Sequence, residues 1–127
     1  MPEIESVLIT WMKATSEITD LVGQRITPGS LPDKQPMPAI TVSRLSGPRS
    51  SDLPLASPIV QVTHWADTWA GARAVAKVVR EELDRASKIQ SGLTIVRVTH
   101  LNDLDVKDST TGRYTVPMDF KVLAREE

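Results

Sequence analysis

The stretch from Ile59 to Leu83 constrains the fold of this chain more than any other. It begins with apolar residues at every second position, which is typical of a strand with one buried face. It continues as an apolar stripe at helical spacing, with Asp67 as the expected N-cap of the helix. A second alternating run, over residues 113–125, predicts the last strand. The two runs together predict a sheet with a long helix laid across it.

The remaining patterns complete an α+β fold. Apolar residues between Ile4 and Met12 recur at helical spacing and predict an N-terminal helix. A short helix is expected to begin with Ser16 as its N-cap and to end before Gly23. Further strands are expected at residues 24–27, 39–46, 58–63 and 94–101. The last two strands of the chain should form a hairpin. The expected architecture is a mostly antiparallel sheet of four to five strands, with the N-terminal helix and the long helix packed on one face.

The same patterns predict which residues are buried. The helix stripes place Trp11 and Trp69 in the core. The face of the sheet away from the helices is expected to be polar. It would carry Gln61, Thr63, Arg97, Thr99, Thr115, Asp119 and Lys121. Pro117 has no N–H to give to a ladder, so its strand is expected to be bulged or at an edge there.

Length and composition narrow the class of protein. The chain has 127 residues, which fits one domain over residues 1–127. Its formal net charge of −1 gives no global electrostatic reason to bind nucleic acid or an anionic membrane. No apolar stretch approaches the roughly 20 residues of a membrane span, and acidic residues stand where a signal peptide has basic ones. A protein of the cytoplasm is therefore expected. The absence of cysteine excludes disulfides, thiol catalysis and cysteine zinc sites.

The two histidines are the only candidates for acid–base catalysis. His64 and His100 each fall near the end of an expected strand. Either would form an acid–base pair with Asp67 or Asp103 if the fold brought the groups together. No nucleophile or third group is spaced to assist, so a half-buried or surface histidine is the expectation. No catalytic residue and no cofactor site is assigned.

Other motifs also favour structural interpretations. Residues 102–108 resemble the start of a calcium loop, but Lys107, Asp108 and Tyr114 stand where that loop needs a ligand, a glycine and a glutamate. A solvated acidic loop without metal is expected. A candidate basic patch is interspersed with acidic residues and lacks interleaved aromatic residues for base stacking, which favours a solvated face. Its members are Arg44, Arg49, Arg73, Lys77 and Arg80. Trp65 ends its strand on the polar face, where it either covers the edge of the core or meets another protein.

Two long segments, residues 24–38 and 47–57, are rich in proline and polar residues. The connection over residues 102–112 is a third. Connections longer than about 12 residues are uncommon in a compact domain unless they have a function. With no catalytic set to serve, these segments and the open edges of the sheet are expected to contact other chains.

Four blocks of the sequence resemble, in order, the tail terminator (tail completion) family of long-tailed bacteriophages and related gene-transfer particles. The blocks are Leu21–Gly29 with Leu31-Pro32, Pro38–Val42 with Ser46-Gly47, Val60–Ala66 with the helix to Leu83, and Gly112–Tyr114 with Asp119–Val122. They cover nearly the whole chain. Thr27 and His64 depart from the family pattern, which often has an aromatic residue at the first position and a small or apolar one at the second.

The resemblance implies a structural virion protein and not an enzyme. Members of the family form rings, commonly hexameric, on the last ring of the tail tube. They stop tube polymerisation and present a docking surface to head-completion proteins. The implied location is the head-proximal end of the virion tail, reached by assembly in the host cytoplasm. DNA would pass through the ring without sequence-specific recognition, and no membrane partner is implied.

A closed ring needs one patch that complements a different patch on the neighbouring subunit. Residues 47–57 and 102–112 are expected to make axial contacts. The outer face of the long helix or the sheet edges would touch neighbouring subunits, with arginines of one subunit meeting aspartates of the next. The expected interface residues are Arg49, Asp52, Trp65, Arg73, Arg80, Asp103, Asp105 and Asp108.

Three other interpretations stay open at the level of sequence. One is another head–tail connector, either a stopper or a tube subunit. The second is a small hydrolase or metal-dependent enzyme that uses His64 or His100. The third is a host adaptor or a regulatory binding module.

Overall fold

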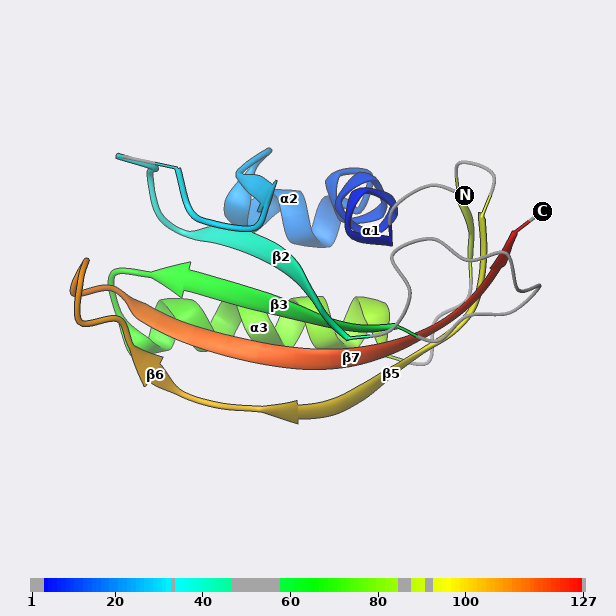
Figure 1. Ribbon diagram of the computed structural model, residues 1–127. Helices are drawn as coiled ribbons and strands as arrows, with labels where there is room; N and C mark the ends of the chain where they lie inside the picture. Colours follow the sequence, from blue (N-terminus) through cyan, green and yellow to red (C-terminus); the bar gives the residue numbers. More distant parts are fainter. Residues whose placement is uncertain (1–3, 33, 47–57, 85–87, 91–92, 127) are drawn as a thin grey trace.

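The computed structural model describes residues 4–32, 34–46, 58–84, 88–90 and 93–126 (Figure 1). The helices are α1 (Ile4–Lys13), α2 (Ser16–Val22) and α3 (Trp69–Leu83). The strands are β1 (Ile26–Pro28), β2 (Ala39–Ser46), β3 (Ile59–Ala66), β4 (Lys88–Gln90), β5 (Leu93–Asp103), β6 (Val106–Lys107) and β7 (Tyr114–Glu126). The sequence predicted all of these except the short strands β4 and β6.

The sheet is mixed and mostly antiparallel. Its strand order is β1-β2-β3-β7-β5-β4, with β6 beside β7. β1 and β2 run parallel, and the other pairs are antiparallel. β5 and β7 pair as the predicted hairpin. Because β3 and β5 both run antiparallel to β7, they are parallel to each other with β7 between them. The connection from β3 to β5 contains α3 and then the short edge strand β4, which pairs antiparallel with β5.

The helices share one hydrophobic core with one face of the sheet. Burial alternates along β3, where Val60, Val62 and Ala66 are buried and the residues between them on the other face are half-buried. Side chains from all three helices belong to the same buried cluster. Figure 1 shows α1 and α2 beside β2, and α3 along β3 and β7. The predicted α+β architecture is confirmed. No helix in the described ranges has the length and apolar character needed to cross a membrane.

The other face of the sheet carries the polar residues expected from the sequence. Gln61 Nε2 donates to Asp119 Oδ1 at 3.2 Å across β3 and β7. Thr115 is an exception because it is buried. Its hydroxyl donates to the Val106 carbonyl oxygen at 2.6 Å, since β6 folds against β7 at this point.

The N-cap of α3 is Thr68, so the prediction of Asp67 is wrong by one residue. Thr68 Oγ1 accepts a hydrogen bond from the Gly71 N–H at 3.0 Å, which satisfies one of the free donors of the first turn. Asp67 is turned to a different partner, and its Oδ1 lies 3.3 Å from Arg113 Nε. Two residues suited to capping are therefore adjacent: Thr68 caps the helix, and Asp67 contacts Arg113, which is distant in the sequence.

Hydrogen bonds within the chain fix the ends of α2 and of the proline-rich segment that follows it. Thr15 and not the predicted Ser16 occupies the N-cap position of α2, and its side chain makes no capping hydrogen bond. Gly23 ends the helix as predicted, with φ 59, a value that favours glycine. Arg25 Nε donates to the Pro38 carbonyl oxygen at 2.9 Å, which ties the two ends of the proline-rich segment together beside β1.

Pro117 was predicted to lie at a bulge or at an edge; it lies within β7, a central strand, at an interruption of the ladder on one side. Its carbonyl oxygen accepts from the Leu104 N–H at 3.0 Å. The N and O of one strand residue face the same neighbour, so the missing N–H of Pro117 also faces this side. The ladder is interrupted there, because pairing with β5 ends at Asp103 and pairing with β6 begins at Val106. The sequence was right that the ladder must fail at this proline.

The molecule is elongated along its strands, and its two ends present different segments (Figure 1). At one end Ala66 pairs with Tyr114, which puts the turn at residues 108–113 beside the start of α3. At the other end Ser46 pairs with Ile59. The segment that joins β2 to β3 therefore leaves and returns at the end opposite to that turn.

Candidate protein-interaction surfaces

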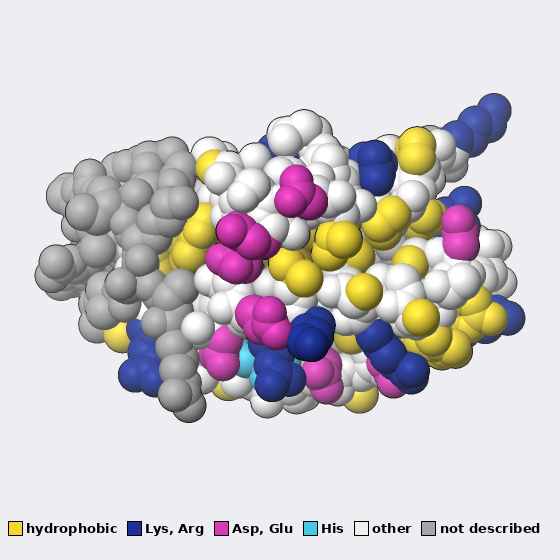
Figure 2. Space-filling view, turned by 180° about the vertical axis from the view of Figure 1, so that it is seen from behind, with side chains coloured by type: hydrophobic (Ala, Val, Ile, Leu, Met, Phe, Trp, Pro, Cys, Tyr) yellow, Lys and Arg dark blue, Asp and Glu magenta, His cyan; other side chains and the backbone are white. Residues whose placement is uncertain are grey.

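A groove runs along the flank of α3 that faces β5 and β6. We refer to it as the α3 groove, and its volume is about 520 Å³. It is lined by Arg73, Ala76, Lys77, Arg80, Glu81, Asp103, Leu104, Asp105, Val116 and Met118. The three basic residues share one helix face because they are spaced by four and three positions. Figure 2 shows charged side chains of both signs gathered on the β5 side of the helix-covered face, below a band of hydrophobic side chains.

Arg73 joins the two walls of the groove. Its Nη2 donates to Asp105 Oδ2 at 2.8 Å, and its guanidinium lies 5.3 Å from the centre of the Trp69 ring. The hydrogen bond and the charge of Asp105 raise the pKa of Arg73. Both side chains are about half exposed, so water screens the pair. The sequence placed Arg73 against aspartates of a neighbour, whereas the structure pairs it with an aspartate of its own chain.

Trp69 is half-buried at the start of α3, so its prediction as a core residue is wrong. Its ring centroid lies 4.7 Å from that of Tyr114, with 53° between the ring planes. Lys107 Nζ lies 5.3 Å from the Tyr114 ring centroid. The two rings are thus flanked by the cations of Arg73 and Lys107, at one end of the α3 groove. Trp69 is the first residue of α3, and the buried residues of the helix begin at Ala72. Trp11 is buried, as predicted.

The aspartates at the end of β5 and beyond it have different partners. Asp103 Oδ2 lies 3.8 Å from His100 Nε2, and Asp105 holds the arginine described above. Asp108 Oδ2 accepts from the N–H and the hydroxyl of Thr111 at 2.9 and 2.7 Å, and these bonds lower the pKa of Asp108. Because the carboxylates diverge, this segment does not form a calcium loop. In the described part of the chain, no group of three or more potential metal-ligating side chains gathers.

His64 is fully buried, so its predicted half-buried or surface position is wrong. It shares the buried face of β3 with Val60 and Val62. Its Nδ1 lies 2.7 Å from the Val116 carbonyl oxygen; a carbonyl can only accept, so Nδ1 carries the proton. Nε2 is buried without a hydrogen-bond partner. Burial lowers the pKa of His64 to about 4, against the raising effect of the bond to Val116. The ring is a neutral part of the core at physiological pH.

His100 is partly exposed, and its ring meets Phe120 edge-on with centroids 5.6 Å apart. Strand β7 separates it from His64. Asp103 is near His100, but Asp67 is held by an arginine at the far end of the sheet. The structure therefore brings together one of the expected pairs, His100 and Asp103, at a distance beyond a hydrogen bond. It buries His64 in the core and holds Asp67 against Arg113.

Trp65 is half-buried on the outer face of the sheet. Its Nε1–H donates to Thr41 Oγ1 at 3.0 Å, so the ring spans from β3 to β2. Arg49 and Asp52 lie outside the described residues.

Four of the predicted interface residues come together in the α3 groove. They are Arg73, Arg80, Asp103 and Asp105. Asp108 lies on the end turn and Trp65 on the outer face of the sheet. Lys77 also lines the groove, although the sequence treated it as part of a solvated face. Its position four residues after Arg73 was the available signal.

The family comparison decides the class of protein. A model of the family described as tail completion protein gp17 matches residues 6–125. The chain belongs to the tail completion protein gp17 family. The protein is therefore a structural component of a virion tail and not an enzyme.

Solved structures show that the fold recurs. A chain described under "Virion of native gene transfer agent (GTA) particle" has a TM-score of 0.78 with 16% sequence identity, over 97% of this chain and 95% of that one. A second solved chain has a TM-score of 0.57 with 16% identity, over 98% of this chain and 92% of that one. At such identities the likeness shows the fold alone. No curated protein matches this sequence.

Proposed function

We propose that this tail completion protein is a tail terminator that works as a single domain. Six copies form a closed ring on the last ring of the tail tube and stop its polymerisation. The ring then presents a docking surface to head-completion proteins at the head-proximal end of the tail. DNA passes through the lumen without sequence-specific recognition. Membership in the tail completion family is the observation that carries this proposal.

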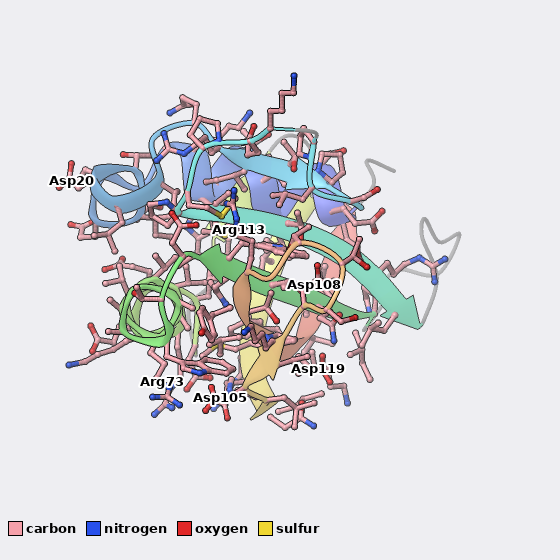
Figure 3. All side chains as sticks on the ribbon, turned by 90° about the vertical axis from the view of Figure 1, so that its left-hand side faces the viewer. Asp20, Arg73, Asp105, Asp108, Arg113 and Asp119 are labelled. Atoms are coloured by element: carbon pink, nitrogen blue, oxygen red, sulfur yellow. The ribbon has the colours of Figure 1, made fainter. Side chains whose placement is uncertain are left out.

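The two ends of the molecule support axial contacts in opposite directions. The segment between β2 and β3 starts and finishes at one end, because Ser46 pairs with Ile59 there. The turn at residues 108–113 lies at the other end and is closed by hydrogen bonds of its own. Figure 3 looks onto this end, with Asp108 and Arg113 on the turn and beside it. One end would meet the tube and the other the head-completion proteins.

Electron microscopy of tube growth tests the proposal. Purified tail tube protein is polymerised with and without this protein, and tube lengths are measured. A terminator should shorten the tubes at substoichiometric amounts and should appear as a ring at one tube end. Long tubes made by this protein alone would identify it as a tube subunit. Unchanged tube lengths, with binding only to head-completion proteins, would identify it as a stopper.

A further inference from the structure

Above its apolar base, the α3 groove holds two cations that form no ion pair with the described residues. Neither Lys77 nor Arg80 forms an ion pair with another described residue. The buried side chains of Ala76, Val116 and Met118 form the base. Leu104 stands on the rim with 61% of its surface exposed. The acidic side chains on the walls are Glu81, Asp103 and Asp105, of which Asp105 is held by Arg73. A partner with acidic residues beside an apolar one would fit this groove.

Helix α2 offers such a set on its outer surface. Glu17, Asp20 and Leu21 are exposed at relative positions i, i+3 and i+4, so they lie on one helix face. Leu21 is 37% exposed. The opposite face of α2 is buried through Ile18 and Val22, which fixes the helix on the core. No ion pair within the described residues engages either carboxylate.

The two surfaces lie on opposite flanks of the molecule. Helix α1 contacts β1 and β2, α2 contacts α1 and α3, and α3 covers β3 and β7. Given the strand order, α2 lies on the β2 side of α3, whereas the α3 groove lies on the β5 side. Figure 3 shows Asp20 projecting from α2 at one side, and Arg73 with Asp105 on the other side of α3. Complementary patches on opposite flanks permit a head-to-tail contact that repeats from one subunit to the next.

We propose that α2 of one subunit packs into the α3 groove of the next copy of this chain. Glu17 and Asp20 face Lys77 and Arg80, and Leu21 covers the apolar base. This inference rests on the proposed ring and identifies the surfaces that close it. Exposed charge pairs add little affinity but set the register of a contact. We assign the groove to a second copy of this chain because the chain itself carries the complementary surface. That surface lies on the opposite flank, where a ring requires it.

Cysteine cross-linking tests the contact directly, because the chain has no native cysteine. Asp20→Cys and Lys77→Cys are made separately and together, and treated with a short bismaleimide. The full chain is used, both alone and with the tail tube protein. Mixed single variants should give a cross-linked dimer, and each single variant alone should give none. The double variant should give a ladder that stops at the number of subunits in the ring.

Charge reversal provides a second, independent test. Lys77→Glu with Arg80→Glu, and Glu17→Lys with Asp20→Lys, should each weaken association at least about tenfold through like-charge repulsion. A mixture of the two variants should restore rings, because every contact then joins opposite charges. The quadruple variant should assemble alone for the same reason. The matched control is Arg97→Glu with Lys121→Glu, which reverses two exposed cations on the outer face of the sheet and should not affect assembly.

The outcomes separate this inference from the proposed function. The contact would be overturned if the wild-type protein forms rings but the mixed Asp20→Cys and Lys77→Cys variants give no cross-linked dimer. Rings formed by both charge-reversed variants would also overturn it. Either result would leave the terminator proposal standing. A dimer formed by Lys77→Cys alone would show a two-fold contact and would also overturn it. Failure of the wild-type protein to form any ring, alone or on tubes, would instead remove the terminator proposal on which the contact depends.

Discussion

Acid should destabilise this protein through His64. In the folded chain the ring is buried and neutral, with its pKa lowered to about 4, while the ordinary value is 6.5. Between these two values the unfolded chain binds a proton that the folded chain does not, so stability falls as pH drops from 6.5 to 4. Each pH unit is worth about 1.4 kcal/mol, so the total loss is about 3 kcal/mol. The charged ring would place a second N–H donor at Nε2, where the structure has no acceptor.

Urea unfolding at a series of pH values between 7 and 4 measures this loss. His64→Gln supplies a neutral side chain with an N–H donor and no titration in this range. The carboxylates titrate in both proteins, so the difference between their unfolding free energies isolates His64. The wild type should lose about 3 kcal/mol more than His64→Gln across this range. Val62→Ala on the same strand face is the control, because it lowers stability without removing a titrating group.

Two results would refute this reasoning. One is a wild-type minus His64→Gln difference that stays constant from pH 7 to pH 4. The other is an NMR titration in which the His64 ring protonates near 6.5 in the folded protein. Either result would mean that the ring is not held neutral by burial, and that the pattern of buried residues in β3 has been misread.

Three further predictions are tested by chemical denaturation, two of them with a comparison variant. Thr68→Ala should lower the free energy of unfolding by about 1 kcal/mol, because it removes the cap of α3. Asp67→Ala should lower it clearly less. The reverse order of the two effects would identify Asp67 as the cap. Trp65→Phe should cost about 1 kcal/mol because the nearly buried Thr41 hydroxyl loses its donor, and no change would show that the ring alone matters. Phe120→Ala should cost about 3–5 kcal/mol by leaving a cavity under α3, with exposed Leu45→Ala as a near-neutral comparison.

The sheet and α3 could be predicted because burial leaves a period in the sequence. Val60 and Val62 mark a strand with one buried face, and the stripe from Ala72 to Leu83 marks a helix on that face. His64 is an even number of residues from both valines, so the alternation along the strand already placed it on the buried face. The predicted half-buried or surface position of His64 was wrong because it followed from the polarity of histidine and not from its place in the alternation.

Long-range contacts could not be predicted from these patterns. Thr68 caps α3, and Asp67 instead lies beside Arg113, which the fold brings to the same end of the sheet. The spacing of the basic residues on α3 predicts one helix face. It does not predict that the corner after β5, with Asp105, lies opposite. The corner stands where pairing of β7 with β5 ends at Asp103 and pairing with β6 begins at Val106.

Labelling of assembled particles tests the central claim most directly. An affinity tag on this protein is decorated with gold or antibody in purified virions and viewed by electron microscopy. A terminator predicts label at the junction of head and tail and nowhere else along the tube. Label distributed along the length of the tail, or confined to the tip away from the head, would contradict the account.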